Sequence, residues 1–424
     1  MTAANTSAAA FARRDGALYC ENVALAGIAA RFGTPTYVYS RRAIEQAFAA
    51  YATALADRRA LVCYAMKANS NLAVLNLLAR AGSGFDIVSG GELARVLAAG
   101  GDAAKVVFSG VGKTEAEVEQ ALAAGILCFN LESVPELEMI ERVARRLHRR
   151  APISVRVNPD VDARTHPYIS TGLKNNKFGV AYTATLDLYR RAAALSHIDV
   201  VGIDCHIGSQ ITTVAPYVDA AERVLDLVDQ LASEGIRLHH VDFGGGLGIR
   251  YGAETPPAPG ELIGALLGRL DARGHGDKTV MFEPGRSIVG GAGALLTRVN
   301  IVKHGETKHF AIVDAAMNDL LRPALYDAWM DVQAVQTSAA APAVYDVVGP
   351  VCESADWLAR ERELRVQPGD LLAVLGAGAY AMSMASNYNS RGRAAEVMVD
   401  DERVFCVRRR ETPADLIAGE SVLP

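Results

Sequence analysis

Apolar residues along the middle of the chain follow two alternating patterns. Short apolar runs predict buried strands, and longer stretches with apolar residues three and four positions apart predict helices that cover a sheet with one face. The predicted strands are Leu61–Ala65, Gly84–Val88, Val106–Ser109, Leu127–Asn130, Ile153–Val157, Val200–Cys205, His239–Phe243 and Thr279–Phe282. The predicted helices are Leu72–Ala81, Glu92–Ala99, Glu115–Ala124, Val134–Arg149, Thr185–Leu195, Tyr217–Glu234 and Pro259–Arg273. This alternation over about 230 residues is typical of an α/β fold of the (β/α)8 TIM-like barrel class.

A barrel places its chemistry at the carboxyl ends of its strands. An open doubly wound sheet is the alternative, but it usually has fewer strands and carries a GxGxxG turn after the first strand, which this chain lacks. The polar residues that follow the predicted strands are Lys67, Asp86, Ser89, Ser109, Asn130, Glu132, Arg156, Asn158, His206, Ser209, Gly244–Gly246, Glu283 and Arg286. We therefore expect them along one rim.

The pattern changes after Val289, where helical periodicity fades. Apolar β-type segments follow at Leu295–Lys303, Phe310–Asp314, Val344–Val348, Leu371–Leu375, Ala395–Val399 and Val404–Arg409, with a short helix expected over Met317–Trp329. These segments predict a second, all-β domain of the sandwich or barrel-like type, joined by short strands near the N-terminus. We expect the barrel over residues 43–290, the β domain over 15–42 and 291–412, and flexible tails over 1–14 and 413–424.

Composition excludes several classes of partner. The net charge of -5 comes from interspersed acids and bases, which gives no basic footprint for nucleic acid and no polybasic membrane patch. No apolar run reaches the roughly 18 residues that span a bilayer, and the N-terminus lacks a secretory pattern, so we expect a cytoplasmic protein. The six cysteines contain no CxxC pair, so neither a metal site nor a disulfide framework is expected.

One lysine has an unusual setting. Lys67 ends a predicted buried strand, within the stretch Tyr64–Ser70. Burial among small and apolar neighbours disfavours an ammonium group, which would make the amine a nucleophile. An isolated lysine at a strand end more often extends to solvent, so this interpretation depends on the rest of the chain.

Two turns suggest a phosphate site. Gly244–Gly248 follow the seventh predicted strand, and Glu283-Pro284-Gly285-Arg286 follow the eighth, where barrels often bind phosphate. A reactive lysine beside a phosphate site suggests pyridoxal 5'-phosphate (PLP), which binds lysine as a Schiff base. Glu283 is the candidate partner of the pyridine nitrogen, although it could instead pair with Arg286. His206 is the candidate ring to lie flat on the cofactor, although a lone histidine is more often structural.

Together these motifs resemble a known family. Tyr64–Asn69, Phe85–Leu93, Cys205–Gln210, Gly244–Gly248 and Glu283–Arg286 resemble the barrel motifs of the alanine-racemase-like, fold-type III PLP-dependent decarboxylases. His166–Gly172 with Asn176–Gly179, Gly349–Ser354 and Ser386–Arg391 resemble the diaminopimelate decarboxylase branch. The resemblance runs from about Gly33 to Arg410 and includes motifs of both predicted domains.

The resemblance implies an activity and a set of roles. The activity is PLP-dependent decarboxylation of meso-2,6-diaminopimelate to L-lysine and CO2, the last step of lysine biosynthesis, by a head-to-tail homodimer with shared active sites. The catalytic residues would be Lys67, His206, Glu283 and Cys352, with Cys352 as proton donor. The cofactor would be bound by Lys67, Asp86, Arg156, His206, Ser209, Gly244, Gly245, Gly246, Glu283, Gly285, Arg286 and Tyr380. The substrate would be bound by Arg286, Arg322, Tyr326, Glu353 and Tyr380. Cys352 and Glu353, in the β domain, would enter the partner's barrel.

Several alternatives stay open. Arg322 suits a distal carboxylate, with Tyr326 on the same helical face, but a surface ion pair would also explain it. The chain could be a sister decarboxylase for arginine, ornithine or carboxynorspermidine, or a racemase, although a racemase of this group should set an arginine rather than Glu283 against the pyridine nitrogen. A PLP-carrying protein without turnover would resemble the barrel alone. Gly392 and Ala355 depart from the family's usual proline and glycine, and we expect small effects.

Overall fold

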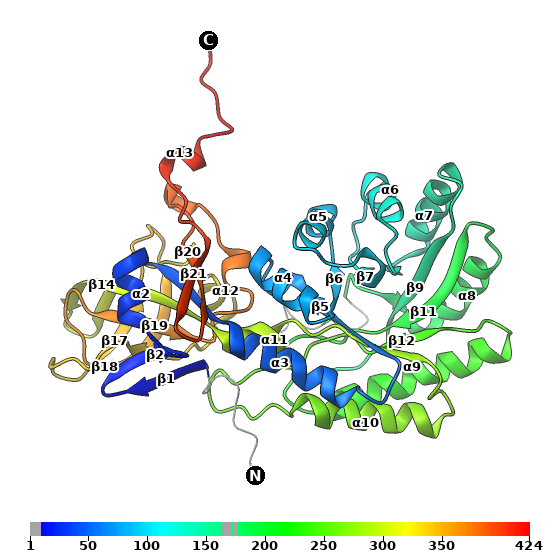
Figure 1. Ribbon diagram of the computed structural model, residues 1–424, viewed down its shortest axis with the longest axis horizontal. Coiled ribbons are helices and arrows are strands. Elements are labelled where there is room, and N and C mark those ends of the chain that lie inside the picture. The colour runs from blue at the N-terminus through cyan, green and yellow to red at the C-terminus, as the bar shows by residue number, and fades with distance from the viewer. Residues whose placement is uncertain (1–9, 163–170, 173–175) are drawn as a thin grey trace. The chain divides into compact units, whose positions relative to one another are not determined.

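The computed structural model describes residues 10–162, 171–172 and 176–424. The chain forms two compact units (Figure 1). The barrel unit comprises Phe48–Ile249 and Thr255–Ser287, and the β unit comprises Met1–Ala47, Arg250–Glu254 and Ile288–Pro424. The β unit is thus built from both ends of the chain.

Eight parallel strands close the barrel unit. They are β5 (Ala60–Ala65), β6 (Gly84–Ile87), β7 (Val106–Phe108), β8 (Cys128–Leu131), β9 (Ala151–Asn158), β11 (Ile198–Asp204), β12 (His240–Asp242) and β13 (Thr279–Phe282). Strand β13 pairs with β5 through Met281 and Leu61, so the sheet has no free edge. Cys63, Val107, Cys128 and Met281 pack as one buried cluster. The predicted barrel is confirmed.

A helix follows each strand and covers the outside of the barrel (Figure 1). The helices are α4 (Leu72–Arg80), α5 (Gly90–Ala98), α6 (Glu115–Ala124), α7 (Val134–Arg146), α8 (Tyr182–Ala193), α9 (Ala215–Ser233), α10 (Pro259–Ala272) and the short α11 (Arg286–Val289). Polar side chains start four of them: Asn71 caps α4, Ser89 caps α5, Thr114 forms a capping box with Glu117 on α6, and Ser133 caps α7. These caps fix where the loops after β5, β6, β7 and β8 end.

A mostly antiparallel sheet organises the β unit. Its strands follow the order β18 (Trp357–Leu364), β17 (Ala343–Val348), β15 (His309–Val313), β14 (Gly293–His304), β4 (Thr36–Ser40), β20 (Ala395–Asp400) and β21 (Arg403–Arg408), with β16 (Val332–Ala334) and β19 (Leu371–Leu375) paired off this path. The long strand β14 pairs with β4, β15 and β19. A separate small sheet contains β1 (Phe11–Arg14), β2 (Ala17–Cys20) and β3 (Val23–Ala24). The predicted second, all-β domain is confirmed.

Three segments of the β unit differ from the prediction. Phe11–Arg14, expected in a tail, form β1 because Phe11 is buried and the strand pairs with β2. The helix expected over Met317–Trp329 covers only α12 (Arg322–Tyr326): Asp319 accepts a hydrogen bond from the backbone of Ala316 before it, and Asp327 ends it in the left-handed region. Strand β18 was not predicted because its Arg and Glu residues obscure the apolar pattern of an edge strand.

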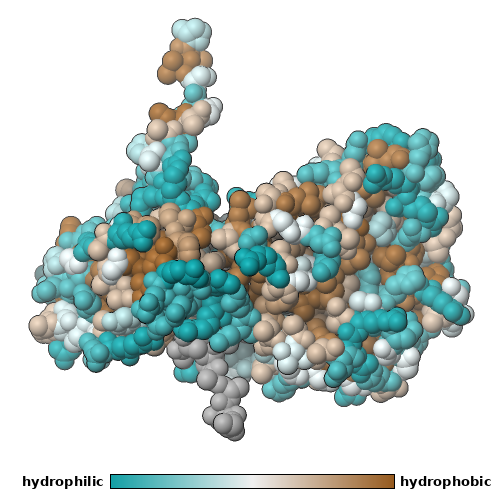
Figure 2. Space-filling view, in the orientation of Figure 1, coloured by the Kyte–Doolittle hydropathy of each residue, from teal (hydrophilic) through white to brown (hydrophobic). Residues whose placement is uncertain are grey.

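In the part of the chain that the structure describes, no helix is long and apolar enough to cross a membrane. Figure 2 shows strongly hydrophilic residues spread over both units on the face in view. Helix α13 (Pro413–Leu416) adds one capped turn within the expected C-terminal tail.

Candidate active site

A cavity of about 420 Å³ lies in the barrel unit at the carboxyl ends of its strands. It is lined by Lys67, Val88, Ser109, Gly110, Val111, Gly112, Arg156, Thr171, Phe178, His206 and Glu283. Four of these residues, Lys67, Arg156, His206 and Glu283, were singled out from the sequence. The strand-end rule therefore locates a cavity of the size that a small ligand requires.

Lys67 enters this cavity from a single 3-10 turn, Met66–Ala68, that follows β5. Its Nζ atom lies 2.6 Å from Oδ2 of Asp86, a buried residue on the next strand. The lysine side chain is 37% exposed. The side chain is therefore less buried than the sequence suggested, and a carboxylate lies beside its amine. Asp86 fixes where the amine points.

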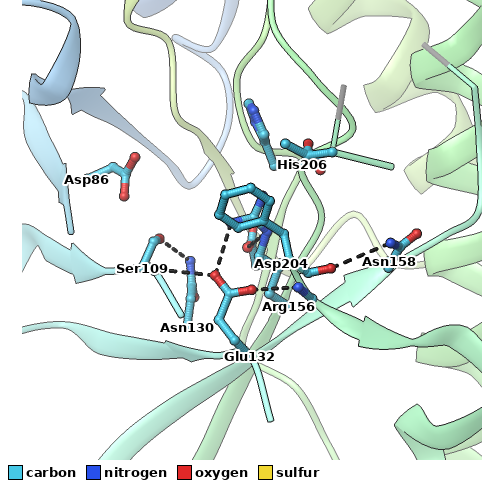
Figure 3. Close-up of polar contacts among 12 residues, drawn as sticks. Asp86, Ser109, Asn130, Glu132, Arg156, Asn158, Asp204 and His206 are labelled. Atoms are coloured by element: carbon cyan, nitrogen blue, oxygen red, sulfur yellow. Dashed lines mark hydrogen bonds and ion pairs between the residues drawn. The ribbon is translucent and has the colours of Figure 1, made fainter. Parts of the chain in front are cut away.

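His206 follows β11, and the ring borders the cavity (Figure 3). Burial, reinforced by the positive charges of Arg156 and Lys67, lowers the pKa of the imidazole well below its ordinary value. The backbone N–H of Gly245 donates to Nδ1 at 3.2 Å, so the neutral ring carries its proton on Nε2. The glycine loop thus fixes both the position and the tautomer of the ring.

Glu283 belongs to a cluster of three buried acids with Asp204 and Asp242, whose carboxylate oxygens lie within 4.8 Å of one another. Burial first, and then the neighbouring carboxylates, raise the pKa of Glu283 and of Asp204 well above their ordinary values. Burial raises the pKa of Asp242 to about 7. Burial therefore favours the protonated form of these carboxyl groups, and a group that brings positive charge to Glu283 would offset the cost of burying a carboxylate there.

The glycine loop after β12 requires its glycines. A Cβ atom on Gly245 would lie 2.0 Å from the carbonyl oxygen of Glu283, and one on Gly246 would lie 2.2 Å from that of Gly208. Gly244 and Gly246 also have positive φ angles of 67° and 102°. Beside this loop, Nη2 of Arg286 donates to Oγ of Ser209 at 3.1 Å. A guanidinium, a hydroxyl and closely approaching backbone fit a phosphate, so the residues present fit PLP.

One predicted substrate residue of the β unit, Arg322, packs against two tyrosines. This residue is 5% exposed, which rules out the surface ion pair as its explanation. Its guanidinium lies over the rings of Tyr251, at 5.0 Å, and Tyr326, at 5.6 Å. Such stacking holds the planar group in one orientation. Tyr251 was missed in the sequence because it lies in the loop that follows the glycine turn.

The other β-unit candidates lie on loops. Cys352 is exposed, and its backbone N–H donates to Oδ1 of Asn389 at 3.0 Å. Glu353 is also exposed and accepts a hydrogen bond from the hydroxyl of Tyr388 at 3.2 Å. Tyr380 adopts a left-handed backbone with φ 52°. The thiol of Cys352 is thus accessible, whereas Cys63, Cys128 and Cys205 are buried.

Comparisons with known proteins identify this arrangement. Residues 41–290 match the family model of the pyridoxal-binding domain of pyridoxal-dependent decarboxylases. The chain is 63% identical to diaminopimelate decarboxylase of Pseudomonas aeruginosa over 414 residues, which are 98% of this chain and 99% of that one. This chain belongs to the diaminopimelate decarboxylase family.

Solved structures of the diaminopimelate decarboxylase family agree. The enzyme from M. jannaschii in co-complex with L-lysine has a TM-score of 0.94 at 38% identity and covers 99% of each chain. The enzyme from Helicobacter pylori complexed with L-lysine has a TM-score of 0.89 at 43% identity and covers 93% of this chain and 98% of that one. The resemblance in the sequence to PLP-dependent decarboxylases is confirmed.

Some family motifs need comment. Most of the diaminopimelate decarboxylase motif His166–Gly172 lies outside the described residues. At Gly392, which departs from the family's usual proline, a Cβ atom would lie 2.4 Å from the carbonyl oxygen of Glu411. At the position where the family usually has proline, the backbone of Gly392 therefore passes close to the backbone of Glu411. Ala355, the second departure, is half-buried.

Several residues at the cavity were not assigned a role from the sequence. Asp204 and Asp242 were overlooked because their proximity to Glu283 depends on the register of three neighbouring strands. Phe178 and Thr171 line the cavity from positions outside the predicted strands and helices. Glu132 and Ser109 were recognised only as polar residues at strand ends.

Proposed function

We propose that this chain decarboxylates meso-2,6-diaminopimelate to L-lysine and CO2 with PLP, the last step of lysine biosynthesis. The observation that carries the proposal is one barrel cavity lined by a lysine amine, a neutral imidazole and a buried carboxyl group. When bound, PLP supplies an electron-withdrawing ring that stabilises the negative charge left on the substrate's α-carbon.

In this proposal the barrel residues hold and orient the cofactor. Lys67 would hold it covalently, His206 would stack on its ring, and Glu283 would pair with its pyridine nitrogen, where the positive charge would offset the burial of the carboxylate. Asp86 and Arg156 support the ring and the lysine. The phosphate is held by Ser209, Gly244, Gly245, Gly246, Gly285, Arg286 and Tyr380.

The proposed substrate-binding residues recognise the two ends of diaminopimelate. Diaminopimelate has a distal carboxylate and a distal ammonium group in addition to the amino acid that reacts. Arg322, already oriented by aromatic rings, suits the carboxylate, because a guanidinium matches it with two parallel hydrogen bonds. Glu353 suits the ammonium group, and Arg286, Tyr326 and Tyr380 complete the set. Ornithine has no distal carboxylate and would not need Arg322.

Cys352 is the proposed proton donor after CO2 leaves. The exposure of Cys352 and Glu353 supports a role at the barrel of a second copy of the chain. We therefore propose a cytoplasmic head-to-tail homodimer with shared active sites. The domain boundaries, with a barrel over 43–290 and a β domain over 15–42 and 291–412 that carries the proton donor, stay a prediction.

A substrate panel tests the proposed function. The purified protein, supplied with PLP, is given meso-diaminopimelate, its LL isomer, lysine, arginine and ornithine, while CO2 and the amine product are measured. We expect L-lysine from the meso isomer and no product from the others. Release of CO2 from arginine or ornithine would leave the cofactor assignment intact and overturn the assignment of Arg322 and Glu353.

A further inference from the structure

Glu132 follows strand β8 and is buried behind the cavity wall, where its carboxylate joins three segments (Figure 3). Oε1 accepts hydrogen bonds from Nη1 of Arg156 at 3.0 Å and from the backbone N–H of Gly110 at 3.2 Å. Oε2 accepts a hydrogen bond from the backbone N–H of Gly179 at 2.6 Å. One side chain thus connects the loop after β7, the end of β9 and the segment before β10 (Val180–Ala181).

Each of these segments supplies part of the cavity wall. Gly110 and Arg156 line the cavity directly, and Gly179 follows Phe178, which also lines it. The guanidinium of Arg156 lies over the ring of Phe178 at 5.0 Å. Movement of Glu132 would therefore displace three parts of the wall together.

Glu132 also maintains the charge of Arg156. Burial opposes that charge, but the neighbouring acids Glu132, Asp204, Glu283 and Asp86 together outweigh burial and raise the pKa of the guanidinium. Nε of Arg156 lies 3.8 Å from Oδ2 of Asp204, so the side chain is held from two sides. A buried arginine that loses one of two carboxylate partners becomes free to reorient.

A second buried glutamate offers a matched comparison. Glu136 accepts a hydrogen bond from Nζ of Lys113 at 2.6 Å, and Lys113 also donates to the carbonyl oxygen of Gly110 at 2.8 Å. Among the described contacts, Glu136 pairs with Lys113 and not with Arg156. Oε2 of Glu136 also accepts a hydrogen bond from the backbone N–H of Glu132 at 2.8 Å, which the amide oxygen of a glutamine can still accept. Glu136→Gln therefore removes the charge that pairs with Lys113 and leaves the guanidinium held by Glu132.

We propose that Glu132 is a positioning residue that holds Arg156 and the adjoining walls in the geometry that binds PLP. This inference rests on the proposed function. Glu132 acts through Arg156 and the backbone of Gly110 and Gly179. Its loss should therefore change cofactor affinity and turnover, in addition to any loss of stability.

The test compares Glu132→Gln with Glu136→Gln. Each variant and the wild type are stripped of PLP and titrated with PLP, with visible absorbance as the readout, and thermal unfolding is measured alongside. Because a hydrogen bond to a charged group is lost, we expect Glu132→Gln to weaken PLP binding by about tenfold or more. We expect Glu136→Gln to stay within about threefold of the wild type in affinity, although it breaks a buried ion pair and lowers the unfolding temperature.

A double-mutant cycle identifies the route of the effect. If Glu132 acts through Arg156, then Glu132→Gln should weaken PLP binding much less in an Arg156→Lys background than alone. Additive effects, or equal losses of affinity in Glu132→Gln and Glu136→Gln, would overturn the positioning role. So would a Glu132→Gln protein that binds PLP like the wild type.

Two further measurements keep the outcomes distinct. If Glu132→Gln does not fold, Glu132→Asp carries the test, because it keeps the charge but its shorter side chain cannot span all three partners; wild-type affinity in that variant overturns the proposal. A wild-type protein without the absorbance of lysine-bound PLP would overturn the proposed function itself. Wild-type absorbance with unchanged affinity in the Glu132 variants would overturn only the role of Glu132.

Discussion

The amine of Lys67 lies 2.6 Å from a carboxylate oxygen of Asp86; Lys67 follows strand β5 in a 3-10 turn, and Asp86 lies on the neighbouring parallel strand β6. The pairing fixes the lysine at the cavity without burying it. It also means that the charge of this lysine is already compensated before any ligand arrives. The behaviour of Lys67 is therefore the first property to test.

Replacing Lys67 with alanine should abolish both turnover and the visible absorbance of lysine-bound PLP, because among the described residues that line the cavity this side chain supplies the only amine. Absorbance spectroscopy of the purified protein with added PLP checks this. Lys105→Ala is the control, since its amine contacts the carbonyl oxygen of Gly82 away from the cavity. Wild-type absorbance in the Lys67 variant would contradict the assignment.

The two exposed cysteines make a matched pair. Cys352→Ala should retain PLP but lower kcat by about 100-fold or more, the usual effect of removing a general acid. Cys406→Ala removes an equally accessible thiol from strand β21 and should leave kcat unchanged. Steady-state kinetics on both variants, with cofactor content measured in parallel, decides the matter. Equal rates in the two variants would remove Cys352 from the mechanism.

Arg322→Gln should raise KM for meso-diaminopimelate by about tenfold to 100-fold, because a charged hydrogen-bond partner of the distal carboxylate is lost. Arg360→Gln is the control: that arginine also stacks on an aromatic ring, at 3.7 Å from the ring of Trp357, but it is exposed. The measurement is KM and kcat for each variant. A KM that does not change in Arg322→Gln would show that this residue does not bind substrate.

The stability of the protein should depend on pH through Asp242. Folding raises the pKa of this carboxyl group from 3.8 to about 7, so between these values the folded protein binds more protons than the unfolded protein. The free energy of unfolding therefore falls as the pH rises through this window. Asp242→Asn should reduce the fall by on the order of 4 kcal/mol. Urea denaturation of both cofactor-free proteins over this pH range measures their free energies of unfolding. Equal pH dependence in the wild type and in Asp242→Asn would contradict the prediction.

The sequence was most informative where one physical rule determined the outcome. Strands such as Thr279–Phe282 were predicted correctly because a barrel strand buried on both faces reads as an apolar run. The rim position of Lys67, His206 and Glu283 followed from the rule that barrels place polar groups at strand ends. The resemblance to a family added roles that no spacing could supply.

Contacts between residues that are distant in the sequence could not be predicted from such patterns. The proximity of Asp204, Asp242 and Glu283 depends on the register between strands, which a linear pattern does not encode. The stacking of Arg322 on Tyr251 joins residues far apart in the chain. The helix over Met317–Trp329 was overestimated because the local bonds of Asp319 and the left-handed Asp327 override helical propensity.

The position of β4 in its sheet has a consequence for the order of events during synthesis. Strand β4 is made early, yet its two sheet neighbours, β14 and β20, are made only after the whole barrel has been translated. All five of its residues are buried in the finished protein. A nascent chain must therefore carry this strand, with unpaired backbone groups on both edges, while the barrel folds. We therefore expect the N-terminal part of the ribosome-bound chain to be the part most prone to aggregation until β14 and β20 have been synthesised.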